Sequence, residues 1–375
     1  HYERSRSIWK KTIKARDLFN QFCQERIGTG RMYVMNIDHC NDHSSFIDKI
    51  KMSNLCQEIT LPTTPLTHID DDEDNDGEIA LCVLSAINVG AIRKLEELQD
   101  ICSNIVRSLD SVIEYQSYPV SASKKMLKRR SIGVGITNLA YYLAKHNVRY
   151  DDKEACNVVD ELMEYVQYYL IKASVDLARE KGKCEWFDKT KYSKGILPID
   201  TYCKEVDKLV TRKLKLNWEK LRKEVKQHGM RNSTLTALMP CESSSLVTNS
   251  TNGVEPPRGL LSIKKSKQGL IPQVVPDIYN LRNKYTLAFD MEDNIGYTNI
   301  IAVIQKYVDQ AISGNHYYNF NKYENGNLSM SDVARDLLHS YKMGVKTLYY
   351  ANTDDGKTDK HIDEADDCAG GACKL

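Results

Sequence analysis

The chain has 375 residues, of which 52 are Lys or Arg and 51 are Asp or Glu, giving a net charge of +1. A charge this small creates no overall field that would attract nucleic acid or a membrane surface, so we expect neither as a partner. The length and composition exclude a solenoid, a collagen and a disulfide miniprotein. The apolar stretch at residues 79–92 is too short to span a bilayer.

Cysteine usage and the first residues of the chain indicate a reducing compartment. The eleven cysteines are odd in number and scattered in spacing, which is not typical of a disulfide framework. The chain begins at His1, and no basic segment leads into an apolar one, so no secretory signal is visible. We therefore expect a cytoplasmic location and a chain that begins inside a longer protein.

The predicted elements mix helices and strands without an internal repeat, which is typical of an α/β fold. Apolar spacing and turn residues predict, in chain order, a helix at 7–26, a strand at 32–38, an extended segment at 54–66, a strand at 79–89, helices at 91–115, 137–146, 153–181 and 217–227, strands at 234–239 and 284–291, and helices at 297–313 and 330–343. Gly182 and Gly229 are predicted helix ends.

The composition changes after Tyr350. Residues 351–375 are rich in acidic residues and poor in core formers, so we expect an ordered domain over 1–350 and a flexible tail over 351–375. Cys368 and Cys373 flank two glycines in this tail and can bend into a disulfide. Redox exchange is the favoured interpretation of this pair, with zinc binding as the alternative.

Asn54, Cys56 and Glu58 stand two residues apart, and on an extended backbone all three side chains project to one side. They offer an amide to hold a hydroxyl, a thiol for one-electron or nucleophilic work, and a carboxylate that can take a proton. Spacing alone favours the structural alternative, which is a half-buried strand.

Three further signals each have a structural alternative. Cys82 lies in an apolar strand, where a cysteine is usually a small hydrophobe. The run at 240–244 follows a strand with small hydroxyl residues and could hold phosphate oxygens or simply cap a helix. Tyr349 and Tyr350 could pass an electron if their rings stack, although two tyrosines in a strand are common.

Other patterns are weaker. The acidic run at 72–77 lacks the final glutamate of an EF-hand loop, and His39, Cys40 and His43 have no fourth ligand nearby, so we expect no metal site. Residues 133–138 lack the third glycine of a dinucleotide fingerprint and are interpreted as a helix-entry turn. The basic cluster at 124–130 is interpreted as a solvated face.

Taken together, several segments resemble the catalytic subunit of class I ribonucleotide reductase, in order and spacing along the whole chain. Those that carry the resemblance are Ser53–Ile59, Gly77–Cys82, Trp218–Pro240 with His228-Gly-Met-Arg-Asn-Ser-Thr234 and Ala237-Leu-Met-Pro240, Tyr349-Tyr350, and the pair Cys368 and Cys373.

The resemblance implies a ten-stranded α/β barrel made of two half-barrels, with Cys56 on a finger loop through its centre. This chain would carry the second half. The regulatory amino-terminal domain and the first half-barrel, with its own reducing cysteine, would lie on another part of the enzyme.

The resemblance also implies a reaction, the reduction of ribonucleoside diphosphates to deoxyribonucleoside diphosphates for DNA synthesis. A thiyl radical on Cys56 would abstract the 3′ hydrogen, Glu58 would accept the 3′ hydroxyl proton, and Asn54 would orient the substrate. Cys82 would supply reducing equivalents, and the tail pair Cys368 and Cys373 would restore them. Substrate contacts are expected from Asn54, Leu55, Cys56, Gln57, Glu58, Pro240, Cys241, Glu242, Ser243 and Ser244.

The implied partners are the amino-terminal half of the large subunit, a metal-containing small subunit that supplies the radical through Tyr349 and Tyr350, and thioredoxin or glutaredoxin. The chain itself is expected to bind no cofactor directly, and alone it would be inactive. A competing hypothesis is a non-catalytic module that binds the small subunit and uses its tail for thiol exchange.

Overall fold

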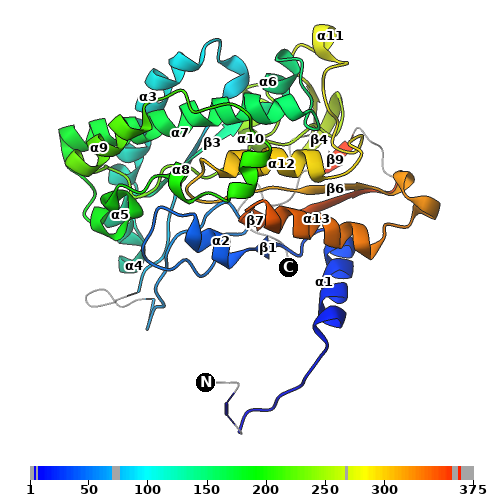
Figure 1. Cartoon of the computed structure of the whole chain (residues 1–375), viewed down its shortest axis with the longest axis horizontal. Helices are drawn as coiled ribbons and strands as arrows, with labels where there is room; N and C mark the ends of the chain where they lie inside the picture. The colour runs from blue at the N-terminus through cyan, green and yellow to red at the C-terminus, as the bar shows by residue number, and fades with distance from the viewer. Residues whose placement is uncertain (1–3, 6, 70–76, 267–268, 357–361, 365–375) are drawn as a thin grey trace.

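The computed structural model describes residues 4–5, 7–69, 77–266, 269–356 and 362–364 (Figure 1). Its helices are α1 (Ala15–Thr29), α2 (Ile37–Asp42), α3 (Leu98–Tyr115), α4 (Ser121–Lys124), α5 (Met126–Arg129), α6 (Leu139–Lys145), α7 (Lys153–Lys181), α8 (Pro198–Thr201), α9 (Trp218–His228), α10 (Glu242–Val247), α11 (Ile278–Leu281), α12 (Ile295–Gln305) and α13 (Met330–Lys342). Its strands are β1 (Val34–Met35), β2 (Val83–Asn88), β3 (Ile132–Thr137), β4 (Leu261–Ser266), β5 (Gly269–Val274), β6 (His316–Asn319), β7 (Thr347–Leu348), β8 (Ala351–Asp354) and β9 (Ile362–Glu364).

Parallel segments form the centre of the fold. β2 pairs with β3, Val134 of β3 bridges to Thr236, and Leu238 bridges to Ile312, all in parallel. β6 then pairs in parallel with β8, and the amide of Tyr349 donates to the carbonyl of Gly314 at 2.7 Å. The parallel order is therefore β2, β3, 234–238, 310–319 and 347–354.

Each connection in this array includes at least one helix, as parallel neighbours require. The array is open among the described residues, where no closed barrel is formed, so the structure supports an α/β fold without the expected ten strands. β1 pairs antiparallel with β7 at its edge, and β4 pairs antiparallel with β5 and parallel with β9.

The long helix α7 covers the array and packs against α3, α9 and α12 (Figure 1). β3 beneath it is buried along its whole length, including Gly133 and Gly135. A Cβ on Gly133 would lie 2.9 Å from that of Ala237, and one on Gly135 would lie 3.0 Å from the carbonyl oxygen of Ala237. The interpretation of 133–138 as a helix-entry turn is therefore wrong, since most of this segment belongs to β3. Its two glycines let two central strands approach closely.

Several predicted elements are confirmed and others are corrected. α7 has the predicted bounds. Most ends of α3, α6, α9 and α13 lie within one or two residues of the predicted ends. Gly182 and Gly229 follow α7 and α9, and both have a positive φ. α3 starts seven residues later than predicted, however, and α12 ends at Gln305 because the chain turns into the central array. Residues 284–291 form turns, and 234–239 makes only isolated bridges.

The basic cluster at 124–130 is not a solvated face throughout. Arg129 is 4% exposed and pairs with Glu78 and Asp48, and Arg130 is 5% exposed and pairs with Asp110. The prediction failed here because a charge run does not reveal acidic partners that are distant in the sequence.

The paired structure also continues past Tyr350. β8 pairs with β6 over Ala351–Asp354, so the tail expected from residue 351 begins with an ordered strand. β9, further along the same segment, pairs with β4. Cys368 and Cys373 lie outside the described residues, as does most of the acidic run at 72–77.

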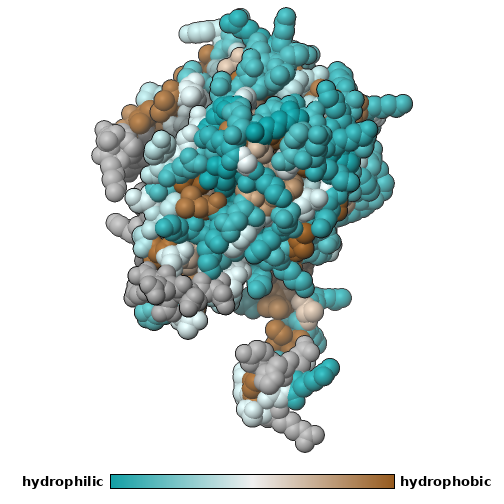
Figure 2. All heavy atoms as spheres, turned by 90° about the vertical axis from the view of Figure 1, so that its left-hand side faces the viewer, coloured by the Kyte–Doolittle hydropathy of each residue, from teal (hydrophilic) through white to brown (hydrophobic). Residues whose placement is uncertain are grey.

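The amino-terminal part projects from the body as an arm. α1 begins only at Ala15, and the residues before it are extended instead of helical as predicted (Figure 1). Apolar side chains of this arm face solvent, as the brown spheres on the projection show (Figure 2), and they include Ile8, Trp9, Ile13, Leu18 and Phe19. No helix among the described residues has the length and apolar character needed to cross a membrane.

Candidate active site

The loop that carries Asn54, Cys56 and Glu58 is a tight turn and not the extended segment that we predicted. Gln57 has a φ of 70°, and its amide donates to the carbonyl of Asn54 at 3.2 Å. Asn54 and Glu58 nevertheless meet, because the turn returns the chain and the Asn54 amide donates to Glu58 Oε1 at 2.9 Å. Cys56, at the turn, is directed instead toward Tyr349.

The central array holds this turn in place from one side. The amide of Ala311 donates to the carbonyl of Glu58 at 3.0 Å. The hydroxyl of Ser313 lies 2.6 Å from the carbonyl oxygen of Cys56 and 3.1 Å from Glu58 Oε2. One short segment of the array therefore fixes both the backbone of the turn and the carboxylate.

Glu58 is 3% exposed, and burial raises the pKa of its carboxyl above the usual range. Hydrogen bonds to its own backbone, to Asn54 and to Ser313 oppose that rise. Both side-chain donors are neutral, so they hold the carboxylate without the strong depression of pKa that a cation would cause. A buried carboxyl with a raised pKa suits general-base chemistry near neutrality.

A hydrogen-bonded chain links Cys56 to two tyrosines. The Cys56 sulfur lies 3.5 Å from the hydroxyl of Tyr349, which donates to that of Tyr350 at 3.0 Å. The two ring centroids are 3.9 Å apart, and the ring of Tyr33 packs against both, with centroids at 4.8 and 5.6 Å. Burial raises the pKa of Tyr349, so its phenol stays protonated in the resting protein. The contact geometry allows proton and electron to move between sulfur and phenols over short distances.

The arm contributes to this arrangement through Arg26, which is fully buried although it lies on the projecting helix α1. Its guanidinium donates to the carbonyl of Tyr349 at 3.0 Å and to that of Tyr350 at 3.4 Å. Burial lowers the pKa of Arg26 to about 10, which leaves it charged at neutral pH. α1 is thus tied to the backbone of the tyrosine pair.

Cys82 lies just before β2, and its sulfur accepts a hydrogen bond from the Gln310 amide at 3.4 Å. Burial, together with the nearby charge of Glu58, raises the pKa of the Cys82 thiol to about 12, although the hydrogen bond from Gln310 opposes that rise. Cys82 and Glu58 are therefore neighbours in the same site, which the sequence signals did not establish.

The run at 240–244 leads into α10 from the segment beside Ala311 and Ser313. Pro240 is half-buried, and Glu242, Ser243 and Ser244 are exposed. Cys241 is 2% exposed, with its sulfur 3.6 Å from the carbonyl of Met239, and burial raises its pKa to about 11. The thiol is therefore buried in the protein, whereas the side chains that follow it are exposed.

Sequence reasoning missed Gln310 and Ser313, which contact Cys82, Cys56 and Glu58. We placed both in a predicted helix at 297–313, where nothing in their spacing marked them. Their contacts are long-range, since Ser313 lies 255 residues from Glu58. The DQAIS run at 309–313 becomes informative only when the parallel array places it beside the turn.

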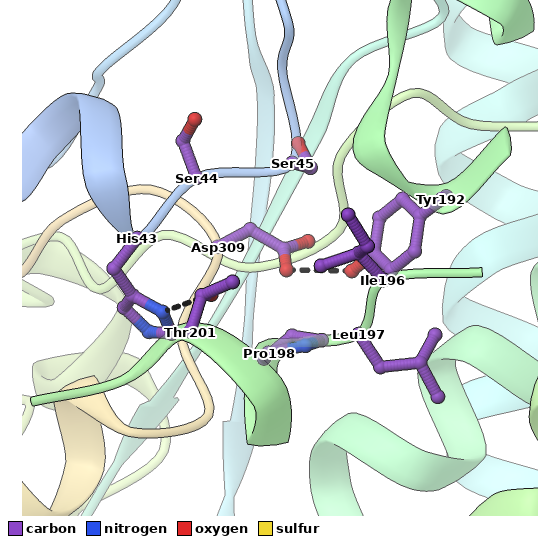
Figure 3. Close-up of a pocket in the computed structure, with 9 residues that line it drawn as sticks. All are labelled: His43, Ser44, Ser45, Tyr192, Ile196, Leu197, Pro198, Thr201 and Asp309. Atoms are coloured by element: carbon purple, nitrogen blue, oxygen red, sulfur yellow. Dashed lines mark hydrogen bonds between the residues drawn. The ribbon is translucent and has the colours of Figure 1, made fainter. Parts of the chain in front are cut away.

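A small cavity borders this segment at Asp309, and Cys56 is not among the residues that line it (Figure 3). Asp309 faces it, and its buried carboxylate accepts from the Tyr192 hydroxyl at 2.6 Å and the Leu235 amide at 2.7 Å. Its lining residues are His43, Ser44, Ser45, Tyr192, Ile196, Leu197, Pro198, Thr201 and Asp309. The contacts of Asp309 hold the segment at 309–313 in place, and no cysteine is among the residues that line the cavity.

The histidines and cysteine considered for a metal have separate partners. His43 contacts the Thr201 hydroxyl and the carbonyl of Gln305, His39 contacts the carbonyl of Tyr341, and the Cys40 sulfur lies 3.8 Å from the carbonyl of Lys346. Within the described ranges, no group of three or more His, Cys, Asp or Glu side chains could hold a metal ion.

Comparisons with known proteins identify the family of this chain. A family model described as ribonucleotide reductase, barrel domain, matches residues 1–351. Ribonucleoside-diphosphate reductase subunit alpha of Haemophilus influenzae is 52% identical over 378 residues, and ribonucleoside-diphosphate reductase 1 subunit alpha of Escherichia coli K12 is 49% identical over 383. The corresponding subunit of Enterobacteria phage T4 is 44% identical over 384 residues.

These alignments cover 100% of this chain and 50% of each relative, so the chain spans about half the length of the curated relatives it matches. The matched region includes the turn with Cys56, the array that holds it and the tyrosine pair. This chain therefore belongs to the ribonucleotide reductase barrel-domain family.

Proposed function

We propose that this chain is the carboxyl-terminal half of a ribonucleoside-diphosphate reductase catalytic subunit, active when joined by the amino-terminal half. The observation that carries the proposal is the turn at 54–58, where a sulfur, a buried carboxyl and an amide are held together beside a tyrosine pair. The parallel segments β2, β3, 234–238, 310–319 and 347–354 would be five of ten strands, with the turn as the finger loop.

In the proposed reaction, the Cys56 thiyl takes the 3′ hydrogen of the ribose, and Glu58 accepts the 3′ hydroxyl proton. The 2′ carbon–oxygen bond then breaks, and the oxygen leaves as water. Asn54 shares its amide with Glu58 and is placed to orient the substrate hydroxyls. Cys56 finally regains its hydrogen, so the radical is returned and not consumed.

Two thiols provide the reduction. One substrate hydroxyl and two thiols give one carbon–hydrogen bond, one water and one disulfide, which balances atoms and electrons. Cys82 would be one of these thiols, and its partner would lie on the amino-terminal half. Cys368 and Cys373 would then exchange with that disulfide and be reduced in turn by thioredoxin or glutaredoxin.

The substrate diphosphate is proposed to lie at 240–244. The backbone amides there and the exposed hydroxyls of Ser243 and Ser244 are the available donors. Because the Cys241 thiol is buried, its side chain would take no part in holding phosphate.

The oxidising equivalent would reach Cys56 through Tyr350 and Tyr349 from the metal-containing small subunit. The continuous contacts from Tyr350 Oη to Tyr349 Oη to Cys56 Sγ support this direction of transfer. This chain would therefore bind no cofactor of its own for the reaction.

The projecting arm has features that support the amino-terminal half of the subunit as a partner. Its exposed apolar residues, with Trp9 84% exposed, form a surface of the kind that partners cover. The relatives contain about as much chain again outside the matched region. We propose that the amino-terminal half packs against the arm (Figures 1 and 2).

The test is conversion of CDP to dCDP by the two halves assembled with the small subunit and a dithiol reductant. We expect activity in the wild type, none in Cys56→Ser, and near wild-type activity in the control Cys203→Ser, whose half-buried thiol contacts the carbonyl of Lys342 outside the site. Conversion that survives Cys56→Ser would refute the radical role. A binding module would instead tolerate Asn54→Ala and Glu58→Ala while losing thiol exchange with Cys368→Ser.

A further inference from the structure

Gln310 touches the sulfur of Cys82 from a fully buried position in the central array. Its side-chain nitrogen lies 3.4 Å from that sulfur and 3.3 Å from the carbonyl oxygen of Ile132. An amide nitrogen has two hydrogens, so both contacts can be made together. The carbonyl of Ile132 also determines which way the amide faces, since the reverse orientation would set two oxygens against each other.

The backbone of Gln310 is fixed as firmly as its side chain. Its amide donates to the carbonyl of Thr236 at 3.1 Å, and its carbonyl accepts from Lys346 Nζ at 2.5 Å and from Gln305 Nε2 at 3.1 Å. The donor aimed at Cys82 is therefore held in one place by several elements of the fold. The proposed reaction does not otherwise use this residue.

The amide donor of Gln310 can act when the active-site disulfide is reduced again. When a dithiol opens a disulfide, the first thiolate bonds to one sulfur and expels the other, and the second thiolate then expels the remaining one. Whichever sulfur is attacked first, Cys82 leaves once as a thiolate. That negative charge would form in a buried site next to Glu58, where it is disfavoured.

We propose that Gln310 is a positioning residue that donates a hydrogen bond to the Cys82 sulfur and stabilises its thiolate when the active-site disulfide is reduced. This inference rests on the proposed function, because it assigns Cys82 to the reducing pair. It concerns the recovery of the reduced enzyme and not the radical step at Cys56.

The experiment compares Gln310→Met with Asn294→Leu in the assembled enzyme. Asn294 serves as the control because it is also buried and donates from its side-chain amide, to Asp336 Oδ2 at 2.8 Å, at a place where it contacts neither Cys82 nor Gln310. Pre-reduced enzyme without external reductant measures the first turnover. Reduction of the oxidised enzyme by dithiothreitol, which bypasses the tail, measures recovery.

We expect Gln310→Met to leave the first-turnover product unchanged and to slow recovery about tenfold to a hundredfold, the range for a hydrogen bond to a charged group. Asn294→Leu should leave the ratio of the two rates unchanged. Equal effects of both variants on recovery, or an unchanged recovery rate in Gln310→Met, would overturn the inference. If Gln310→Met does not fold, Gln310→Glu keeps the side-chain length and should slow recovery further by charge repulsion.

A second readout separates this inference from the proposed function. The pH profile of Cys82 alkylation by iodoacetamide, followed by peptide mass spectrometry, requires no turnover. The profile should move to higher pH in Gln310→Met and stay in place in Asn294→Leu. A wild type that makes no dCDP would contradict the proposed function, whereas an unmoved alkylation profile would contradict the role of Gln310.

Discussion

Replacing Glu58 by glutamine should lower activity and raise stability at the same time. The carboxylate is 3% exposed, and its two oxygens accept from the neutral groups of Asn54 and Ser313 at 2.9 and 3.1 Å. Glutamine has the same shape, and its oxygen can accept from Asn54 while its nitrogen donates to Ser313. The substitution therefore removes a buried charge while Asn54 and Ser313 each keep a hydrogen bond to the side chain.

The loss of activity follows from the role of Glu58 as proton acceptor. General-base catalysis contributes about 10²–10⁴-fold, so Glu58→Gln should cost roughly 3–5 kcal/mol in the reaction barrier. The gain in stability should be about 0.5–2 kcal/mol, the usual range when a destabilised active-site group is relieved. CDP reduction by the assembled enzyme and the urea midpoint of the chain measure the two effects.

The raised pKa of Glu58 determines how its contribution to stability changes with pH. Because burial raises the folded-state pKa of Glu58, the folded protein holds this proton to higher pH than the unfolded chain does. The favourable contribution of Glu58 is thus present at pH values below its ordinary pKa and is lost as pH rises through the raised value. The stability advantage of Glu58→Gln should therefore be largest at neutral pH and shrink as pH falls toward 4.5. An advantage that stays constant with pH, or a variant with full activity, would refute the reasoning.

Three further outcomes are expected. Asp110→Asn should lower the free energy of unfolding in urea by about 3–5 kcal/mol, because the fully buried Asp110 carboxylate pairs with two arginines. Glu114→Gln, at the exposed edge of the same network, should lower it by about 1 kcal/mol or less. Similar losses in the two variants would contradict this reasoning. Tyr349→Phe should keep the wild-type melting temperature and abolish dCDP formation, and retained turnover would exclude it from the relay. Ser313→Ala removes a donor to the Glu58 carboxylate, so the acid limb of the pH–rate profile should move to higher pH; an unmoved limb would show that the hydroxyl does not act on that carboxyl.

Local patterns were enough to predict part of this molecule. α7 has an uninterrupted apolar pattern and a glycine stop, and its predicted bounds agree with the structure at both ends. The extended backbone that we predicted for Asn54, Cys56 and Glu58 is wrong, since a turn brings Asn54 to Glu58 and directs Cys56 toward Tyr349. The segment at 284–291 shows the limit of such patterns, since a short apolar run there forms turns.

The sequence by itself determined where most of the long helices lie, both ends of α7 and the residue types of the reactive turn, because those depend on neighbours a few positions away. Only the tertiary structure placed Gln310 and Ser313 beside Cys82 and Glu58, and buried Arg129 and Arg130 against acidic partners. Those contacts join residues from 16 to more than 200 positions apart in the chain, so they depend on how the parallel segments are ordered. Pairing between distant segments leaves no local periodicity from which it could be predicted.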